Sequence, residues 1–205
     1  MVFRDVERWF ADRGDYTLRL DYDLNEDSII WIFGGYHGDY VQDIFNKHKC
    51  NVYVFEPCIS SYNILENRFS NDEKIRVFNY GISDKTGDVN FIDLGDASTI
   101  QNLHEDIHDR HVSVVSMKSF KDVYTELKLD TIDLLMMNVE GSEYAILNNI
   151  FENEYTEKII NYQIQFHTHV TGAQQMLEDI REELSKTHKQ DWNYQWVWEN
   201  WSLKS

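Results

Sequence analysis

Residues 28–39 read Ser-Ile-Ile-Trp-Ile-Phe-Gly-Gly-Tyr-His-Gly-Asp, an apolar run that stops at three closely spaced glycines. A continuous apolar run of this length, here Ser28–Phe33, is typical of a strand that is covered on both faces in a parallel sheet. The glycines allow a tight turn and let the backbone approach a ligand, and a following helix presents free N–H groups at its N-terminus. The same glycines would also suit a turn that binds nothing. The segment therefore predicts a buried strand followed by a candidate binding loop.

Similar apolar runs alternate with segments that carry apolar residues at helical spacing. We expect four further strands at Val52–Phe55, Ile75–Phe78, Ile132–Met137 and Tyr162–Phe166, and helices at Tyr40–His48, Ser60–Phe69 and Ser142–Phe151 with Ser60 and Ser142 as N-caps. Strands that alternate with helices in this way form a mostly parallel sheet with helices on both faces. The pattern therefore predicts the α/β class.

Three regions depart from this alternation. Runs at Val89–Asp93 and Val112–Met117 predict two inserted strands, and the polar stretch between them, 95–111, is expected as a loop or short helix near the site. After a helix at Ala173–Lys186, the tail predicts an antiparallel hairpin of Tyr194–Trp198 and Trp201–Leu203, with its turn at Glu199-Asn200. The first 27 residues are interpreted as a capping segment whose Val6, Trp9 and Phe10 share one face. The alternating aromatic residues of the tail are expected to pack in the core.

The composition and net charge limit the kinds of protein and of binding partner that we expect. The chain has 205 residues, which predicts a single domain over 28–205 behind the N-terminal segment. Its net charge of −17 repels phosphate backbones and anionic membranes, so neither nucleic acid nor membrane is expected as a partner. Two cysteines are too few for a disulfide framework, and no apolar stretch is long enough to cross a bilayer. These observations favour a cytoplasmic location.

Ligands of open parallel sheets bind at the carboxyl ends of the strands, so the residues that follow each strand matter most. Glu56 and Pro57 end the second strand, and the carboxylate of Glu56 lies ~20 residues beyond the glycine turn, where an acidic side chain can accept hydrogen bonds from both hydroxyls of a ribose. Ser83 and Asp84, after the third strand, lie in a polar turn that suits an adenine edge, although ordinary turn chemistry would explain them equally well.

Several of these segments together resemble the FkbM-like family of methyltransferases that depend on S-adenosyl-L-methionine (SAM). The resemblance rests on the segments 34–38 (Gly-Gly-Tyr-His-Gly), 55–57 (Phe-Glu-Pro), 79–87 (Asn-Tyr-Gly-Ile-Ser-Asp-Lys-Thr-Gly), 97–99 (Ala-Ser-Thr) and 132–143 (Ile-Asp-Leu-Leu-Met-Met-Asn-Val-Glu-Gly-Ser-Glu). Their order and spacing make a chance match improbable. The resemblance implies a Rossmann-like SAM methyltransferase fold, in which a mostly parallel seven-stranded sheet ends in an antiparallel hairpin.

The resemblance also implies roles for individual residues. Gly34, Gly35, Tyr36 and Gly38 would line the methionine part of SAM, Glu56 with Pro57 would hold the ribose, Ser83 and Asp84 would lie near adenine, and Asn138 would border the methyl group. Four positions depart from the family pattern, which usually has an acidic residue at Ile32, an Asn at Tyr36, a Lys at Met136 and an Asp at Asn138. The amino-acid end of SAM is therefore less well provided for than in other members.

Transfer of a methyl group to a hydroxyl needs alignment and a base that removes the proton. The candidates are Glu140, His167 and His37, each of which could instead be a polar residue that only caps a helix or bonds to backbone. His167 and His169, and the group His104, His108 and His111, lack a motif-defining metal spacing, so no metal is expected.

The function that the resemblance implies is O-methylation of a hydroxyl on a small molecule or glycan, and this substrate class rests on the resemblance alone. The alternative is a degenerate member that binds SAM, its product S-adenosylhomocysteine (SAH) or a partner without catalysis, since charges are missing at Ile32, Met136 and Asn138. A nicotinamide-dependent oxidoreductase is less well supported, because the first turn lacks the G-x-G-x-x-G spacing.

Overall fold

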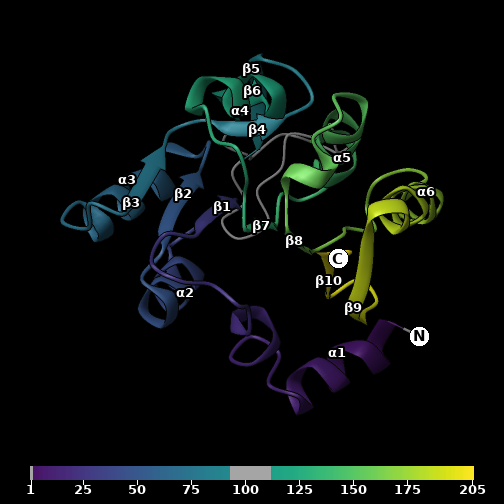
Figure 1. Cartoon of the computed structure of the whole chain (residues 1–205). Coiled ribbons are helices and arrows are strands. Elements are labelled where there is room, and N and C mark those ends of the chain that lie inside the picture. Colours follow the sequence, from purple (N-terminus) through teal and green to yellow (C-terminus); the bar gives the residue numbers. More distant parts are fainter. Residues whose placement is uncertain (1, 93–111) are drawn as a thin grey trace.

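The computed structural model describes residues 2–92 and 112–205 and contains a large sheet with helices packed around it (Figure 1). Seven strands form this sheet in the order β3-β2-β1-β7-β8-β10-β9. They are β1 (Ile29–Phe33), β2 (Asn51–Phe55), β3 (Ile75–Phe78), β7 (Leu134–Met137), β8 (Asn161–Ile164), β9 (His188–Tyr194) and β10 (Trp198–Leu203). The first five of these in spatial order are parallel, and β10 runs antiparallel to both β8 and β9. The predicted α/β fold, its seven-stranded sheet and its antiparallel end are confirmed.

Helices cover both faces of the sheet because its strands are apolar on both sides. The helices are α1 (Val2–Ala11), α2 (Asp39–His48), α3 (Ile59–Phe69), α4 (Phe120–Leu127), α5 (Glu143–Glu152) and α6 (Ala173–Thr187). In β1, Trp31 and Phe33 join the core cluster beneath α4, α5 and α6, whereas Ile30 and Ile32 join the cluster beneath α1, α2 and α3. Side chains alternate between the faces of a strand, so one apolar run supplies both cores.

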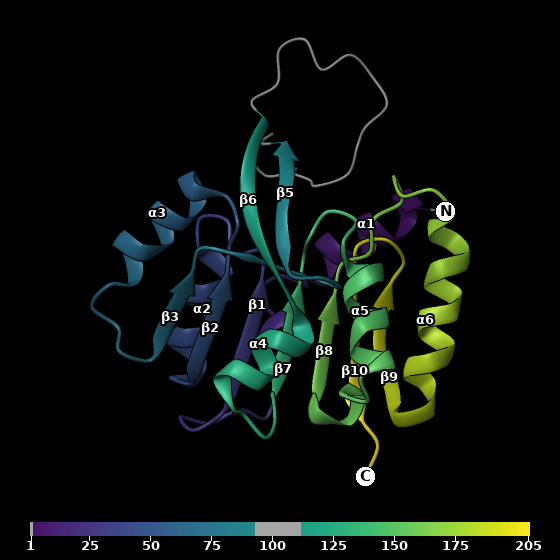
Figure 2. The same cartoon turned by 90° about the horizontal axis from the view of Figure 1, so that it is seen from above.

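The order of the strands determines where a ligand can bind. β1 lies between β2 and β7, so the chain moves outward in one direction through β2 and β3 and then returns to the other side of β1. Figure 2 shows the carboxyl ends of the parallel strands along one edge of the sheet. In sheets of this type, the crevice beside such a reversal is the usual ligand site.

A second, three-stranded sheet projects from that edge (Figure 2). It contains β4 (Gly81–Ser83), β5 (Gly87–Ile92) and β6 (Val112–Ser119), with β6 between the other two. The inserted strands β5 and β6 agree with the prediction, whereas β4 and α4 were not predicted. The stretch 95–111, including His104, His108 and His111, lies outside the described residues.

Three local predictions were wrong. The turn of the C-terminal hairpin lies at 195–197 instead of Glu199-Asn200, and both of those residues belong to β10. The N-cap position of α3 is Cys58, so Ser60 lies inside the helix. In α1, Trp9 is buried but Phe10 is 70% exposed and so does not share its face.

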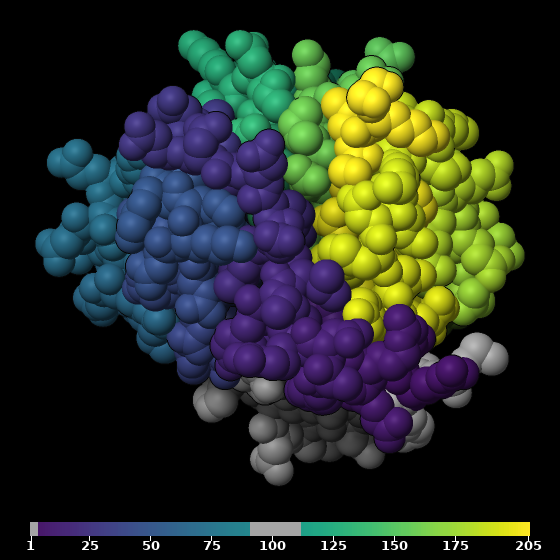
Figure 3. Space-filling model, turned by 60° about the horizontal axis from the view of Figure 1, so that its bottom comes forward, coloured from purple at the N-terminus to yellow at the C-terminus, as the bar shows by residue number. Residues whose placement is uncertain are grey.

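The N-terminal segment packs against the sheet domain over much of its length. In Figure 3, the purple N-terminal residues lie between the blue helix α2 and the yellow C-terminal hairpin. Tyr194 donates a hydrogen bond to Asp12 at 2.6 Å, and Lys47 donates to the carbonyl of Leu20 at 2.7 Å. Residues 12–21 are thereby held against both α2 and β9. Within residues 2–92 and 112–205, no helix combines the length and apolar character that crossing a bilayer requires.

Candidate active site

The glycine turn after β1 is shaped mainly by close contacts with its own protein. Gly34 and Gly38 have φ values of 82° and 87°, in the left-handed region that favours glycine. A Cβ on Gly34 would clash with the carbonyl oxygen of Asn138, at the end of the neighbouring strand β7. A Cβ on Gly35 would clash with Val54. The glycines therefore let β1, β2 and β7 end close together.

Glu56 organises the same turn from the end of β2. Its Oε2 accepts hydrogen bonds from the backbone N–H groups of Gly35 and Tyr36 at 3.1 and 3.0 Å, and its Oε1 accepts one from Cys58 at 2.9 Å. The side chain is 6% exposed. Sequence reasoning predicted a ribose ligand for this carboxylate but missed that it also fixes the glycine turn. The ribose contact stays a prediction.

The residues predicted near adenine follow the end of β3. Ser83 is the last residue of β4 and its hydroxyl donates to Asp84 at 3.1 Å, while the Asp84 carbonyl accepts from Asn149 of α5. These two residues therefore anchor the small sheet to α5. The adenine contact remains untested.

A cavity of about 250 Å³ lies between the glycine turn and the neighbouring strand ends. Its walls include the segment 34–41, Asn138 after β7, Gln165 after β8, Trp198 at the start of β10, and Arg19 from the N-terminal segment. Of the predicted cofactor residues, it brings together Gly34, Gly35, Tyr36, Gly38 and Asn138. Neither Glu56 nor Pro57 nor the Ser83–Asp84 pair lines it.

Asn138 contributes an unusual atom to this cavity. Its Oδ1 is buried and has no hydrogen-bond partner among the described residues. Buried polar atoms in folded proteins are nearly always paired, so each exception needs an explanation. An oxygen of this kind on a cavity wall can accept a hydrogen bond from a ligand.

Glu140, His167 and Glu143 form a polar cluster at the carboxyl ends of β7 and β8. The Nε2 of His167 lies 3.2 Å from Oε1 of Glu140, and its Nδ1 lies 3.2 Å from Oε1 of Glu143. Glu143 is fully buried, and its two oxygens also accept from the backbone N–H groups of His167 at 2.7 Å and Gly141 at 2.8 Å. Two of the three predicted base candidates, Glu140 and His167, therefore lie in direct contact.

The charge of this cluster is set by the two carboxylates. Burial alone would lower the pKa of His167, but the hydrogen bonds and charges of Glu140 and Glu143 outweigh it and raise the pKa to about 9. His167 is therefore an imidazolium at neutral pH and donates from both ring nitrogens. The third candidate, His37, lies in the glycine turn, where its ring stacks on Tyr36 with 3.8 Å between ring centres.

Metal ligation finds no support in the described part of the chain. Residues 2–92 and 112–205 contain no group of three or more His, Cys, Asp or Glu side chains placed to hold a metal ion. The second histidine of the predicted pair, His169, instead contacts the Glu140 carbonyl through Nε2 at 3.1 Å.

Sequence reasoning missed several residues of the cavity, among them Arg19, Gln165 and Trp198. Gln165 lies near the carboxyl end of the predicted strand Tyr162–Phe166, so its position was a usable signal, and it directly follows β8 because that strand ends at Ile164. Trp198 was assigned to the core only, yet it is both 7% exposed and part of the cavity wall. Arg19 lies far from every strand end in sequence, and only the path of the N-terminal segment brings it to the site.

Comparison with known proteins gives one family match and a set of similar folds. A family model described as the methyltransferase FkbM domain matches residues 33–195, which confirms the resemblance seen in the strand-end motifs. No curated protein matches the chain.

Among solved structures, the methyltransferase FkbM from Methylobacillus flagellatus KT superposes with a TM-score of 0.60 at 14% identity, covering 88% of this chain and 44% of that one. The chain thus spans less than half the length of that protein. An rRNA methylase from Streptococcus thermophilus has a TM-score of 0.53 at 9% identity and covers 95% of each chain. Fibrillarin from Aeropyrum pernix, solved with natively bound SAM, has a TM-score of 0.51 at 10% identity, with 94% of this chain and 74% of that one covered. At these identities the likeness shows the fold alone.

Proposed function

The chain belongs to the methyltransferase FkbM domain family, and on this premise we propose that it transfers a methyl group from SAM to a hydroxyl of a small molecule or glycan. The observation that carries the proposal is the cluster of Glu140, His167 and Glu143, which follows β7 and β8, the same two strands whose next residues, Asn138 and Gln165, line the cavity. Family membership supports the methyl transfer. The hydroxyl acceptor is our own inference from the chemistry of the cluster.

The residues around the cavity fit SAM. The Oδ1 of Asn138, which has no partner in the described part of the chain, offers a hydrogen-bond acceptor in a residue of the cavity wall. We assign Gly34, Gly35, Tyr36, Gly38 and Asn138 to the methionine end, Glu56 with Pro57 to the ribose, and Ser83 with Asp84 to the adenine side. When bound, SAM supplies an electrophilic methyl group on a sulfonium.

We assign removal of the hydroxyl proton to the cluster of Glu140, His167 and Glu143. Glu140 has the most exposed side chain of the three, at 19%, against 12% for His167 and none for Glu143. A substrate hydroxyl can therefore reach Glu140 first and donate a hydrogen bond to its carboxylate. A hydroxyl oxygen becomes strongly acidic as it gains a methyl group, so a carboxylate suffices to take its proton. His167 holds Glu140 in place, and Glu143 holds His167.

The charge of the chain supports a small or neutral acceptor. With 36 acidic against 19 basic residues, the protein repels an RNA backbone, unlike a typical nucleic-acid-binding domain. The proposal therefore keeps the hydroxylated small molecules and sugars predicted from the sequence, and a cytoplasmic location with them.

The test is a search for turnover in the purified chain. SAM is incubated with a panel of sugars, phenols and aliphatic alcohols, and SAH and methylated products are measured by mass spectrometry. We expect one acceptor class to be methylated and Glu140→Gln to slow transfer by roughly 100-fold or more, since a positioned base contributes about 10²–10⁴. The exposed Glu152→Gln on α5 is the control and should retain the rate.

Two other results would change the conclusion. Equal rates for Glu140→Gln and the unaltered protein would remove Glu140 from the chemistry. Binding of SAH without turnover on any acceptor would favour the degenerate member that the neutral residues at positions 32, 136 and 138 suggested.

A further inference from the structure

Two residues that line the same cavity each carry a buried polar atom that has no hydrogen-bond partner among residues 2–92 and 112–205. They are Nε of Arg19, a donor, and Oδ1 of Asn138, an acceptor. Arg19 belongs to the N-terminal segment and lies outside the matched family domain, whereas Asn138 follows β7. Buried polar atoms in native folds are nearly always paired, so two such atoms from residues of one cavity point to a bound group that pairs with them.

Arg19 is held firmly, so its free Nε is not a sign of a loose side chain. Its guanidinium lies over the rings of Tyr40 and Trp198, with 4.3 and 4.0 Å to the ring centres, and its Nη1 contacts Asp15 at 3.1 Å. Tyr40 in turn donates to the Arg19 carbonyl at 3.1 Å. These contacts fix the guanidinium before any ligand arrives.

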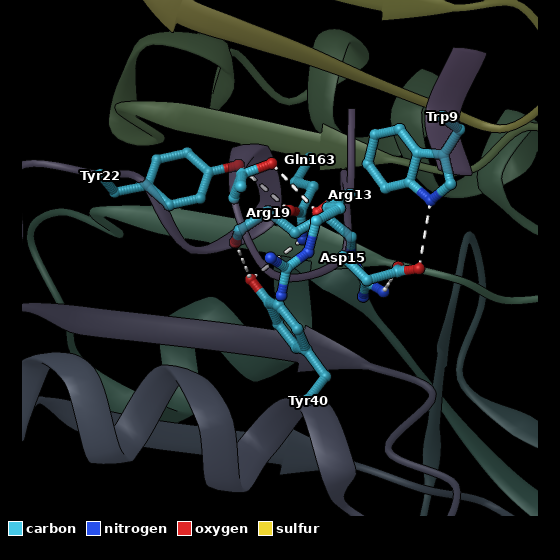
Figure 4. Close-up of polar contacts among 8 residues, drawn as sticks. Trp9, Arg13, Asp15, Arg19, Tyr22, Tyr40 and Gln163 are labelled. Carbon is cyan, nitrogen blue, oxygen red and sulfur yellow. Dashed lines mark hydrogen bonds and ion pairs between the residues drawn. The ribbon is translucent and has the colours of Figure 1, made fainter. Parts of the chain in front are cut away.

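A second layer of contacts supports this arrangement, as Figure 4 shows. Gln163 of β8 donates to the Tyr40 hydroxyl at 3.0 Å, and the Tyr22 hydroxyl lies 3.2 Å from Oε1 of Gln163. Gln163 is fully buried. The segment that carries Arg19 is thus tied to the centre of the sheet and not only to its surface.

The charges around the cavity favour a ligand that carries both signs. Arg19 supplies a positive charge and Asn138 a neutral acceptor, while Asp39 on the wall is already paired with Arg68 at 2.7 Å. Two further residues of the lining, Ile32 and Met136, are neutral and apolar. A free α-amino acid group matches this set, because its carboxylate needs a donor and its ammonium needs an acceptor.

We infer that Arg19 and Asn138 bind the α-amino acid end of SAM, with the carboxylate accepting from Nε of Arg19 and the ammonium donating to Oδ1 of Asn138. This inference rests on the proposed function. It gives the carboxylate contact to the N-terminal segment, and it gives the ammonium contact, for which the apolar Ile32 offers no acceptor, to Asn138. The volume of about 250 Å³ agrees, since pockets for whole drug-sized ligands span roughly 300–1,000 Å³ and this one suits one end of a longer molecule.

The experiment compares two ligands that differ only in the proposed contact group. SAH carries the α-amino acid, whereas 5′-methylthioadenosine keeps the adenosine and the thioether but lacks it. Isothermal titration is run with each ligand on the full chain, on Arg19→Met and on Asn138→Ala. Arg13→Met is the matched control, because Arg13 is an exposed arginine of the same segment that contacts Tyr16 and does not line the cavity.

We expect Arg19→Met to weaken SAH binding roughly 10- to 100-fold, as loss of a hydrogen bond between charged groups does, and to leave methylthioadenosine binding within about twofold. Asn138→Ala should show the same selectivity with a smaller loss, and Arg13→Met should change neither ligand. Should Arg19→Met fail to fold in a thermal melt, the Asn138→Ala comparison decides the question alone.

Two outcomes overturn the inference while the proposed function stands: unchanged SAH affinity in both variants, or equal weakening of both ligands. A chain that binds neither SAH nor methylthioadenosine fails at the proposed function itself, and the inference falls with it. The two failures are therefore distinguishable in one set of titrations.

Discussion

The carboxyl edge of the large sheet carries two polar regions that differ in how their hydrogen bonds are satisfied. In the cluster of Glu140, His167 and Glu143, the two oxygens of the fully buried Glu143 carboxylate accept hydrogen bonds from Gly141 and His167. In the cavity lined by Arg19 and Asn138, the donor Nε of Arg19 and the acceptor Oδ1 of Asn138 are buried without partners among the described residues. Both regions lie at the ends of β7 and β8, so the sheet topology alone does not distinguish them.

This difference indicates which of the two regions has its hydrogen bonds satisfied without a ligand. A buried group whose bonds are all made within the protein contributes to the fold and presets a charge, as Glu143 does for His167. A buried group without partners is unfavourable in the free protein and is satisfied on binding. Substitutions should therefore affect stability in the first region and ligand affinity in the second.

The largest expected effect belongs to Glu143. Glu143→Ala removes the acceptor of the Gly141 and His167 N–H groups and leaves the His167 charge half-paired, so we expect a loss of about 3–5 kcal/mol in the free energy of unfolding. Urea denaturation measures this loss. Glu143→Gln keeps one acceptor oxygen and should lose less. A loss below about 1 kcal/mol for the alanine variant would break the comparison.

The next effect is the pH dependence that His167 adds to stability. Its pKa is about 9 in the folded protein against 6.5 for the ordinary side chain, so the stabilisation is complete below pH 6.5 and disappears as the pH rises through 9. At 1.36 kcal/mol per pKa unit, it is worth about 3 kcal/mol at most.

NMR titration of the His167 ring checks this value directly. Glu140→Gln should move the midpoint down toward 6.5, because one of the two carboxylates that raise the pKa is gone. A midpoint near 6.5 in the unaltered protein would show that the cluster does not preset the charge.

Most of the parallel strands could be predicted because β1, β2 and β7 are short apolar runs buried on both faces. Neither β4 nor α4 was predicted, and the reason differs between the two. β4 has three residues, too few for any periodicity, whereas α4 follows β6 directly and its N-cap Ser119 also ends that strand. The hairpin turn was misplaced because Glu199 looked like a polar turn residue. It is instead 2% exposed in β10, where it pairs with Arg181 of α6.

The site could be predicted in part for the same physical reason. Residues directly after a strand, such as Glu56, Asn138 and His167, share the carboxyl edge by topology, so sequence order alone brings them together. Arg19 has no such link to the edge. Its place depends on Tyr40 and Trp198, which lie 21 and 179 residues later in the chain, and that packing leaves no local pattern.

Glu56 combines features of the two regions, because its carboxylate accepts hydrogen bonds within the protein and is also predicted to bind ribose. Glu56→Ala should destabilise the glycine turn by roughly 1–3 kcal/mol, since three backbone N–H groups lose their acceptor, and should weaken SAH binding at least tenfold. Denaturation and isothermal titration measure the two effects separately. A stability loss with unchanged SAH affinity would assign Glu56 to the turn alone and remove the ribose prediction.

The smallest effect is expected at Asn138, and it separates the two regions most directly. Asn138→Ala removes a buried oxygen that has no partner among the described residues, so no hydrogen bond of that atom is lost and an unsatisfied group disappears. We expect the free energy of unfolding to change by no more than about 0.5 kcal/mol, which urea denaturation resolves against the large loss for Glu143→Ala. A loss as large as that of Glu143→Ala would mean that Asn138 supports the fold, and the contrast between a satisfied and a ligand-dependent region would then fail.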